Sequence, residues 1–375
     1  MNSQKKVSIF SFFSGSGFLD LGFEKTGYNI ELVNEISAPF LEVYSYSRDK
    51  MNLPLPRFGY QNLDINEYFN GQRENLIKHI KEVKKENRVL GFIGGPPCPD
   101  FSVGGKNKGK DGENGKLSMS YVDLIIDMKP DFFLFENVKG LWKTKRHREF
   151  YEELKLKLQS AGYCTTERLT NSLEFGVPQD RERIFLFGVQ KKLLCEEHYN
   201  FHEISDFPWR KYAQYEMDEI RNIDWPNVND FQPNEFTICP ENCIPELTVE
   251  YWFNKNEVYN HPNAHDHFRP RAGLAKMQAI SEGDVGKKSY KRLHRWRYSP
   301  TAAYGNNEVH LHPYKIRRIS AAEALAIQSL PSDFELPHDM SLSNMFKTIG
   351  NGVPFLLSKG IAQTIMDYLL DNKII

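Results

Sequence analysis

The first half of the chain alternates short apolar runs with amphipathic segments. We interpret the apolar runs as strands, at residues 7–13, 30–34, 88–93, 131–135 and 183–189. Between them, apolar residues recur at helical spacing, for example at residues 40–46, 121–128 and 150–158. This alternation is typical of βαβ units, and the uniformly apolar run at 131–135 indicates a strand covered on both faces. The pattern therefore predicts an α/β fold with a mostly parallel sheet.

The pattern changes after about residue 190. Up to about residue 313 the chain is rich in Pro, Asn, His and aromatic residues and shows no helical periodicity, which predicts a loop-rich second domain. Helical signals return near the end. Ser320 and Glu323 form a capping box, and Pro354 can occupy the first turn of a final amphipathic helix.

Length and charge set limits on this picture. The chain has 375 residues, more than one typical core holds, so two domains are expected. Its formal net charge is −1, so any surface that binds nucleic acid must be local. No apolar stretch is long enough to cross a membrane, and we expect no membrane partner.

The cysteines are few and irregularly spaced for so long a chain. They are Cys98, Cys164, Cys195, Cys239 and Cys243. A disulfide scaffold is therefore not expected, and a reducing cytoplasm fits better. Cys239 and Cys243 have a spacing that zinc sites use, but no second cysteine pair occurs, so we predict no metal site.

A glycine-containing loop directly follows the first predicted strand. Residues 13–17 read FSGSG, and such glycines permit a tight turn and the close approach of a ligand to the backbone. Glu35 ends the second strand, where a carboxylate can accept hydrogen bonds from ribose hydroxyls. Asp64 and Ile65 can hold and cover an adenine. The pattern favours a nucleoside cofactor without separating a dinucleotide from S-adenosylmethionine, and the alternative is a structural turn with solvated acids.

Two reactive groups follow neighbouring apolar strands. Cys98 lies between Pro97 and Pro99 on the loop after the third strand, and Glu136 closes the fourth. Because the carboxyl ends of parallel strands meet at one edge of the sheet, we expect both side chains in the same crevice. A carboxyl group that emerges from so apolar a segment can be desolvated, which raises its pKa.

This pair of groups suits attack on an electron-poor ring. A thiolate can add to C6 of a pyrimidine, and nearby arginines such as Arg181 and Arg183 help to lower the thiol pKa. A neutral glutamic acid can protonate N3, and the activated C5 can then attack a sulfonium methyl group. The alternative is structural, with Cys98 a small buried hydrophobe and Glu136 a cap.

Several segments along nearly the whole chain together resemble the motifs of the DNA cytosine-5 methyltransferases of bacterial restriction–modification systems. The matching segments are residues 12–17 (FFSGSG), 96–98 (PPC), 136–138 (ENV), 179–183 (QDRER), 317–320 (RRIS, followed by Glu323, Gln328 and Pro331) and 347–354 (KTIGNGVP). They keep the order that the family has. The resemblance implies a Rossmann-like, S-adenosylmethionine-dependent domain at residues 1–192, completed by 340–375, and a loop-rich target-recognition domain at 193–339 that includes the hinge-side motif.

The resemblance also implies a role for each matching residue. Cys98 is the implied nucleophile, Glu136 the group acting at cytosine N3, and Arg183 with Arg181 contacts the flipped base or orders the pocket. The positions implied to surround S-adenosylmethionine are Phe13, Gly15, Ser16, Gly17, Glu35, Ile36, Asp64, Ile65, Pro97, Leu117, Asn351, Gly352 and Val353.

Three positions depart from the family pattern. Pro99 stands where a Gln usually follows the nucleophile, and Phe18 replaces a usual glycine of the first motif. Gly352 replaces a usual alanine after Asn351. None of these changes removes a reactive group, but Phe18 puts the cofactor contacts at its position in doubt.

The resemblance places DNA recognition in the variable stretch of about 190–315. The densest basic run of the chain, residues 287–297, interleaves basic and aromatic side chains and suits phosphate and base-edge contacts. We therefore expect Arg292, Arg295 and Arg297 to contact DNA, although a solvated basic strand is the alternative. The glycine- and lysine-rich loop at 104–112 is implied to close over DNA, with Ser102 and Lys106 as further contacts.

The implied partner is double-stranded DNA. We expect a monomeric bacterial enzyme of the cytoplasm, with a cognate restriction endonuclease acting separately. The nearest rival is a tRNA cytosine-5 methyltransferase with the same motifs, against which the long variable stretch argues. A catalytically silent binding module would lack Cys98 or Glu136, and an amino-methylating enzyme would need an Asp/Asn-Pro-Pro-aromatic pocket that is absent from the sequence.

Overall fold

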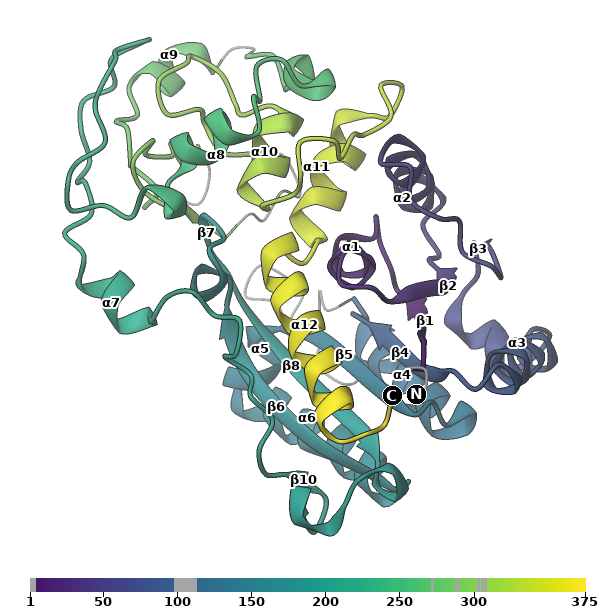
Figure 1. Cartoon of the computed structure of the whole chain (residues 1–375). Helices are drawn as coiled ribbons and strands as arrows, with labels where there is room; N and C mark the ends of the chain where they lie inside the picture. Colours follow the sequence, from purple (N-terminus) through teal and green to yellow (C-terminus); the bar gives the residue numbers. More distant parts are fainter. Residues whose placement is uncertain (1–4, 98–112, 271–272, 287–289, 302–303, 305–308) are drawn as a thin grey trace.

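The computed structural model describes residues 5–97, 113–270, 273–286, 290–301, 304 and 309–375. A twisted nine-stranded sheet runs through the first domain in the order β3-β2-β1-β4-β5-β8-β6-β10-β9 (Figure 1). Its strands are β1 (Val7–Phe12), β2 (Asn29–Asn34), β3 (Tyr60–Gln61), β4 (Val89–Gly94), β5 (Phe132–Val138), β6 (Tyr163–Asn171), β8 (Glu182–Gln190), β9 (Tyr199–Asn200) and β10 (Glu203–Ile204). A separate two-stranded ladder pairs β7 (Gln179–Asp180) with β11 (Ser299–Pro300).

The predicted strands are confirmed, and the sheet is mostly parallel as expected. The pairs β1–β2, β1–β4, β2–β3 and β4–β5 are parallel, whereas β8 runs antiparallel to both β5 and β6. β6 was not predicted, because its sequence YCTTERLTN is polar through the middle and only half-buried there. Because β8 runs antiparallel to β5, the first residues of β8 lie at the carboxyl end of β5, where Arg183 is opposite Val138.

Helices cover both faces of the sheet, and the sheet separates two hydrophobic cores. One core packs against α1 (Phe18–Glu24), α2 (Ala38–Lys50) and α12 (Phe355–Asp371), and the other against α3 (Arg73–Lys85), α4 (Glu113–Met128) and α6 (Lys145–Ser160). The predicted apolar face of the final helix is buried through Leu357, Ile361, Ile365 and Leu369. Pro354 is the N-cap of α12 and precedes its first turn. The C-terminal helix thereby joins the core on one face of the sheet (Figure 1).

The second region is loop-rich, as predicted. Its helices are short; three of them pack around one apolar cluster, and the other two each belong to a smaller cluster. They are α7 (Met217–Asn222), α8 (Val249–Lys255), α9 (Leu274–Gln278), α10 (Ala321–Ile327) and α11 (Leu342–Asn351), while α5 (Lys139–Lys143) belongs to the first domain. The predicted capping box of α10 is present: Ser320 Oγ accepts the Glu323 N–H, and the Glu323 carboxylate accepts the Ser320 N–H.

The sheet continues past the predicted boundary at residue 192. β9 and β10 join its edge, and Phe207 and Trp209 pack into the first core. Phe18 and Leu21 of α1 share an apolar cluster with α8, α10 and α11, so the two regions also meet through side chains. Among the residues that the structure describes, no helix has the length and apolar character needed to span a membrane.

Candidate active site

A cavity of about 680 Å³ lies at the carboxyl ends of β1, β2, β4 and β5. The start of β8 and the connection between α11 and α12 complete its walls. Glu136, Arg181 and Arg183 line this cavity. It is also lined by every predicted cofactor residue except Gly17, namely Phe13, Gly15, Ser16, Glu35, Ile36, Asp64, Ile65, Pro97, Leu117, Asn351, Gly352 and Val353. The topology thus gathers into one place residues that are far apart in the sequence.

The loop after β1 makes a tight turn at the cavity. Phe13, Gly15 and Gly17 all adopt positive φ angles, of 52°, 56° and 74°. A Cβ atom added to Gly15 would meet no heavy atom within 4 Å, so its backbone faces open space that a ligand can approach. Ser16 Oγ shares a short hydrogen bond with Thr348 Oγ1, which ties this loop to the C-terminal segment.

Gly17 differs from the prediction because it shapes the turn instead of lining the cavity. Its carbonyl accepts a hydrogen bond from Arg48 at 2.6 Å. A Cβ atom at this position would lie 2.7 Å from the same guanidinium and would collide with the ring of Tyr44. The glycine is therefore required by packing beneath the loop.

Glu35 is buried at the end of β2 and anchors two backbone segments. Its Oε2 accepts the Gly15 N–H and its Oε1 accepts the Ser37 N–H, each at 2.8 Å. Burial raises the pKa of Glu35, and these backbone hydrogen bonds lower it in part. Ile36, next to it, is 62% exposed at the cavity. The carboxylate is thus fixed in direction and retains lone pairs for a ligand hydroxyl.

Glu136 and Arg183 form an ion pair inside the cavity. Arg183 Nε lies 2.9 Å from Glu136 Oε1, and both side chains are about nine-tenths buried. Burial raises the pKa of the Glu136 carboxyl, while the charges of Arg183 and Arg181 lower it in part. A carboxyl group with a raised pKa beside a cavity is suited to deliver a proton.

The loop after β4 is held against Glu136. A Cβ atom on Gly95 would lie 2.5 Å from Glu136 Oε2, so only glycine lets the carboxyl approach this loop. Asn137 donates its side-chain amide to the Pro96 carbonyl at 3.3 Å. These contacts fix Gly95 to Pro97 relative to β5. Cys98, Ser102 and Lys106, which follow this segment, lie outside the residues that the structure describes.

Arg181 has a structural contact in addition to its place in the cavity. It is almost fully buried and donates to the Gly350 carbonyl at 2.8 Å. Burial, together with the nearby Arg183 charge, lowers its pKa well below the usual arginine value. Arg181 therefore connects the beginning of β8 to the segment that carries Asn351.

Gly95, Asn137 and Thr348 make contacts at the site that were not predicted from the sequence. Two signals could have identified Gly95 and Asn137: a glycine doublet and a polar residue at the ends of neighbouring strands. Such positions border the crevice of a parallel sheet. Thr348 lies within the KTIGNGVP segment, but its contact with Ser16 spans most of the chain. No local pattern reports a contact of that range.

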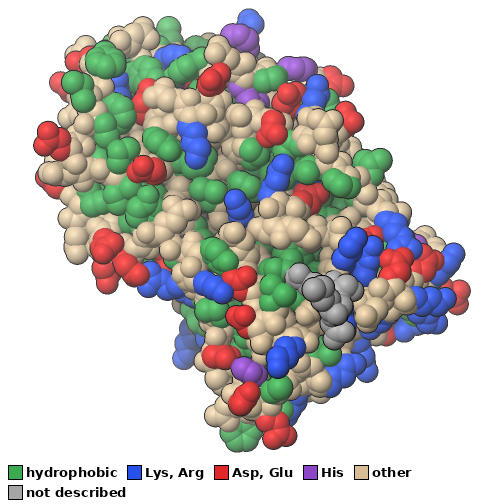
Figure 2. Space-filling model, in the orientation of Figure 1, with side chains coloured by type: hydrophobic (Ala, Val, Ile, Leu, Met, Phe, Trp, Pro, Cys, Tyr) green, Lys and Arg blue, Asp and Glu red, His purple; other side chains and the backbone are tan. Residues whose placement is uncertain are grey.

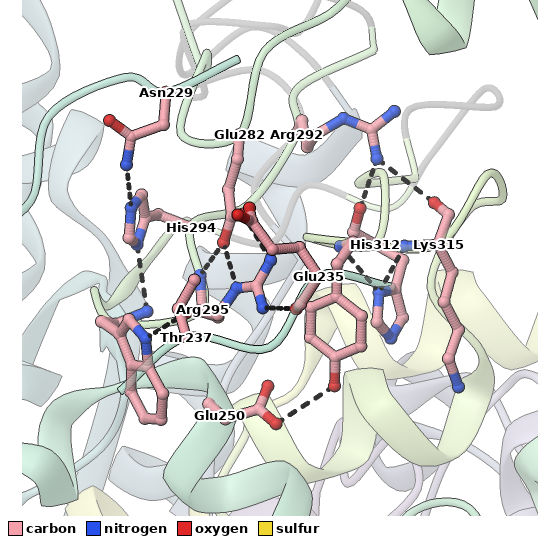
Figure 3. Close-up of polar contacts among 12 residues, drawn as sticks. Asn229, Glu235, Thr237, Glu250, Glu282, Arg292, His294, Arg295, His312 and Lys315 are labelled. Carbon is pink, nitrogen blue, oxygen red and sulfur yellow. Dashed lines mark hydrogen bonds and ion pairs between the residues drawn. The ribbon is translucent and has the colours of Figure 1, made fainter. Parts of the chain in front are cut away.

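The prediction that Arg292 contacts DNA is wrong in this structure. Its side chain is fully buried and donates to the carbonyls of Met277 and Ile280, at 2.6 and 2.8 Å. It also donates to the carbonyls of His312 and Lys315, as Figure 3 shows. A guanidinium that is surrounded by carbonyl groups of its own chain cannot reach a phosphate. Arg292 instead holds two backbone segments together, residues 277–280 and 312–315.

Arg295 is also part of the interior, against the prediction. Its Nε and Nη2 contact the two carboxylate oxygens of Glu282, both at 2.8 Å, and Nη1 donates to the Glu235 carbonyl (Figure 3). Only 3% of Arg295 is exposed. Arg297 differs from both, because it is half-buried and its guanidinium lies 5.3 Å from the ring centre of Tyr298. Arg297 therefore stays a predicted DNA contact.

The visible surface carries mixed charge. Figure 2 shows Lys and Arg side chains interspersed with acidic and apolar ones on the face drawn. This distribution agrees with the net charge of −1. On this face, affinity for a polyanion would therefore come from particular positions.

Comparisons with solved structures show the fold. A protein encoded within an E. coli prophage matches with a TM-score of 0.64 and 21% identity, covering 97% of this chain and all of that chain. The methyltransferase EhMeth of Entamoeba histolytica matches with a TM-score of 0.59 and 16% identity, covering 99% of both chains. The Rossmann-like architecture predicted from the motifs is thereby confirmed.

Comparisons of sequence show the family. The type II methyltransferase M.NmeDI of Neisseria meningitidis serogroup C is 59% identical over 367 residues, which cover 98% of this chain and 85% of the relative. M.FnuDI of Fusobacterium nucleatum is 29% identical over 378 residues, which cover 98% of this chain and 96% of that relative. The family model of the C-5 cytosine-specific DNA methylases matches residues 7–367. The chain therefore belongs to the C-5 cytosine-specific DNA methylases, enzymes that transfer a methyl group from S-adenosylmethionine to C5 of cytosine in DNA.

Proposed function

We propose that this enzyme modifies one cytosine within a specific duplex sequence, as the modification enzyme of a restriction–modification system. The type II methyltransferases that it resembles support this proposal. The enzyme would act as a monomer in the bacterial cytoplasm, and a cognate endonuclease would act on the same sequence separately. Sequence reading would come from the loop-rich region, with Arg297 among its contacts, because the first domain supplies cofactor and chemistry.

In this proposal Cys98 is the nucleophile and Glu136 the acid. The target base leaves the duplex, which costs a few kcal/mol of pairing and stacking. The Cys98 thiolate adds to C6 while Glu136 protonates N3, so that C5 becomes nucleophilic and takes the methyl group. Release of the C5 proton to solvent, departure of the thiolate from C6 and return of the N3 proton to Glu136 restore the aromatic ring and the free enzyme. Arg183 orients Glu136 and the flipped base, and Arg181 supports the pocket.

One observation carries the assignment of the acid. Glu136 is a buried carboxyl with a raised pKa that faces the cavity and is held by Arg183 at 2.9 Å. Gly95 and Asn137 bind the segment that leads to Cys98 against the same carboxyl. Glu136 thus lies against residues 95–97, which directly precede Cys98 in the sequence, and this supports the proposed pairing of acid and nucleophile.

The cavity fits S-adenosylmethionine, which supplies a methyl group on a sulfonium ion. Glu35 would accept hydrogen bonds from the ribose hydroxyls, and Ile36 offers an exposed apolar side chain to cover the adenine. Asp64, whose carboxylate also caps the short helix Ile65–Phe69, would accept from the adenine amino group. The open backbone at Gly15 leaves room for the ligand to approach.

Trapping with 5-fluorocytosine tests the proposed chemistry. The enzyme can release the adduct only after a proton leaves C5, and 5-fluorocytosine carries fluorine there instead. Wild-type enzyme with S-adenosylmethionine should therefore form a denaturant-resistant adduct on DNA that contains this base in the target. Cys98→Ala should form no adduct and transfer no methyl group, yet should still bind S-adenosylhomocysteine. A Cys98→Ala protein that methylates DNA at the wild-type rate would refute the covalent mechanism.

Replacing Glu35 by alanine should weaken cofactor binding by about ten- to a hundredfold, because a charge-assisted hydrogen bond contributes about 1.5–3 kcal/mol. Calorimetric titration with S-adenosylhomocysteine measures the effect. Glu31→Ala is the matched control, since Glu31 is a buried carboxylate on the same strand that pairs with Arg88 and does not line the cavity. Equal affinities of Glu35→Ala and wild type would remove Glu35 from the cofactor site.

A further inference from the structure

Two of the departures from the family pattern meet in space. The resemblance described above implies a glycine at position 18 and an alanine at position 352, and the chain has Phe18 and Gly352 there. A Cβ atom built on Gly352 would lie 2.7 Å from Cε2 and 2.8 Å from Cγ of Phe18, and closer still to Cδ2. Carbon atoms that are not bonded do not approach so closely. The usual alanine is therefore incompatible with Phe18 where it lies.

The ring of Phe18 has little freedom to move away. It is 2% exposed and packs edge-on against Phe334, with the ring centres 5.1 Å apart and the planes at 84°. Leu21, Val43 and Phe346 belong to the same apolar cluster. A larger residue at position 352 would have to displace a side chain that is enclosed on several sides.

Both positions line the cavity proposed for the cofactor. Phe18 begins α1 directly after the loop that carries Ser16, and Gly352 ends α11 next to Asn351 and Val353. The Phe18 ring therefore fills the space at the junction of these two cofactor-facing segments, where the usual pair would have an alanine methyl group instead.

We propose that Phe18 and Gly352 are a reciprocally exchanged pair that sets the wall of the cofactor cavity. In the pattern that the resemblance implies, the bulk is at position 352, whereas here the side chain at position 18 supplies it. Phe18 is thus a positioning residue for the cofactor, because it fixes the spacing between the loop after β1 and the Asn351–Val353 segment. This inference rests on the cofactor site proposed above.

A double-substitution cycle tests the pair, with S-adenosylhomocysteine as the ligand in calorimetric titrations. Gly352→Ala should weaken binding at least tenfold in the wild-type background, since Phe18 must shift and carry the wall with it. In the Phe18→Ala background the same change should leave affinity equal or tighter. Unliganded thermal melts should follow the same pattern, with a large loss in the first background and a small one in the second.

Gly360→Ala is a matched control for a glycine that touches a phenylalanine. A Cβ atom there would lie 2.5 Å from Cε1 of Phe175, but Gly360 does not line the cavity. This variant should lower the melting temperature while its folded protein binds S-adenosylhomocysteine as wild type does. A comparable loss of affinity in Gly360→Ala and Gly352→Ala would show a general packing effect and would overturn the proposal.

The remaining outcomes are equally decisive. Unchanged affinity in Gly352→Ala, or the same loss in both backgrounds, would overturn the pair. If Gly352→Ala does not fold, recovery of folded protein in Phe18→Ala/Gly352→Ala is the expected result, and its failure to recover contradicts the proposal. If wild type does not bind S-adenosylhomocysteine, the proposed cofactor site is wrong, whereas the coupling measured in unliganded melts still decides whether the two residues are exchanged partners.

Discussion

Replacing Glu136 by glutamine should lower the rate of methyl transfer by at least about a hundredfold, the lower range for the loss of a general acid. Glutamine keeps the shape of the side chain and can donate a hydrogen bond to N3, but it cannot transfer a proton. Cofactor affinity should be unchanged. Single-turnover methylation of duplex DNA measures the rate, and titration with S-adenosylhomocysteine measures the affinity.

The pH dependence gives this variant a sharper readout. Burial raises the pKa of Glu136 against the opposing charges of Arg183 and Arg181. The acid form therefore persists to higher pH than for an ordinary glutamate, and activity that depends on it falls as pH rises through the raised pKa. This alkaline decline should be absent from the residual activity of Glu136→Gln. Glu174→Gln, which alters a buried carboxylate paired with Arg168 away from the cavity, should keep it. The same decline in Glu136→Gln would assign it to another group.

Contiguous patterns predicted the catalytic half of the molecule well. The strands of the parallel core are largely apolar, and Glu35, Glu136 and the FSGSG turn lie at or just after their carboxyl ends, so position along the chain also fixes position in space. The ion pair between Glu136 and Arg183 depends in addition on the antiparallel direction of β8. That direction is not encoded in β8 itself, because its residues are buried on both faces as those of a parallel strand would be.

The prediction failed where composition had two physical meanings. A run of arginines interleaved with aromatic residues suits a DNA surface, but it also suits a buried segment whose guanidinium groups bind carbonyls and a carboxylate. Arg292 and Arg295 follow the second course, and their partners lie at least ten residues away in sequence. The Phe18–Gly352 contact illustrates the same limit of sequence-based prediction. The two residues are far apart in sequence, and their contact appears only in the folded chain.

Removal of the Arg295 side chain should destabilise the protein by about 3–5 kcal/mol, because it leaves the Glu282 carboxylate buried without its partner. The exposed fractions of the two side chains are only 4% and 8%, and the contact is made through both carboxylate oxygens. Urea denaturation of Arg295→Ala measures the loss. Glu282→Gln should lower the free energy of unfolding by less. The carbonyl oxygen of the neutral amide can still accept one of the Arg295 hydrogen bonds, whereas its NH₂ group cannot accept the other.

The same variants separate a structural arginine from one that binds DNA. Folded Arg295→Ala should bind DNA with the salt dependence of wild type, because its guanidinium does not reach the surface. Arg297→Ala, from the half-buried neighbour, should keep the unfolding midpoint and lose DNA affinity. If Arg297 contacts phosphate, that loss will be similar for all sequences and the salt slope will fall by about one; if it reads a base edge, sequence preference will relax. An Arg295→Ala protein of wild-type stability with a reduced salt slope would restore the original assignment of Arg295 to DNA and contradict the ion pair's structural role.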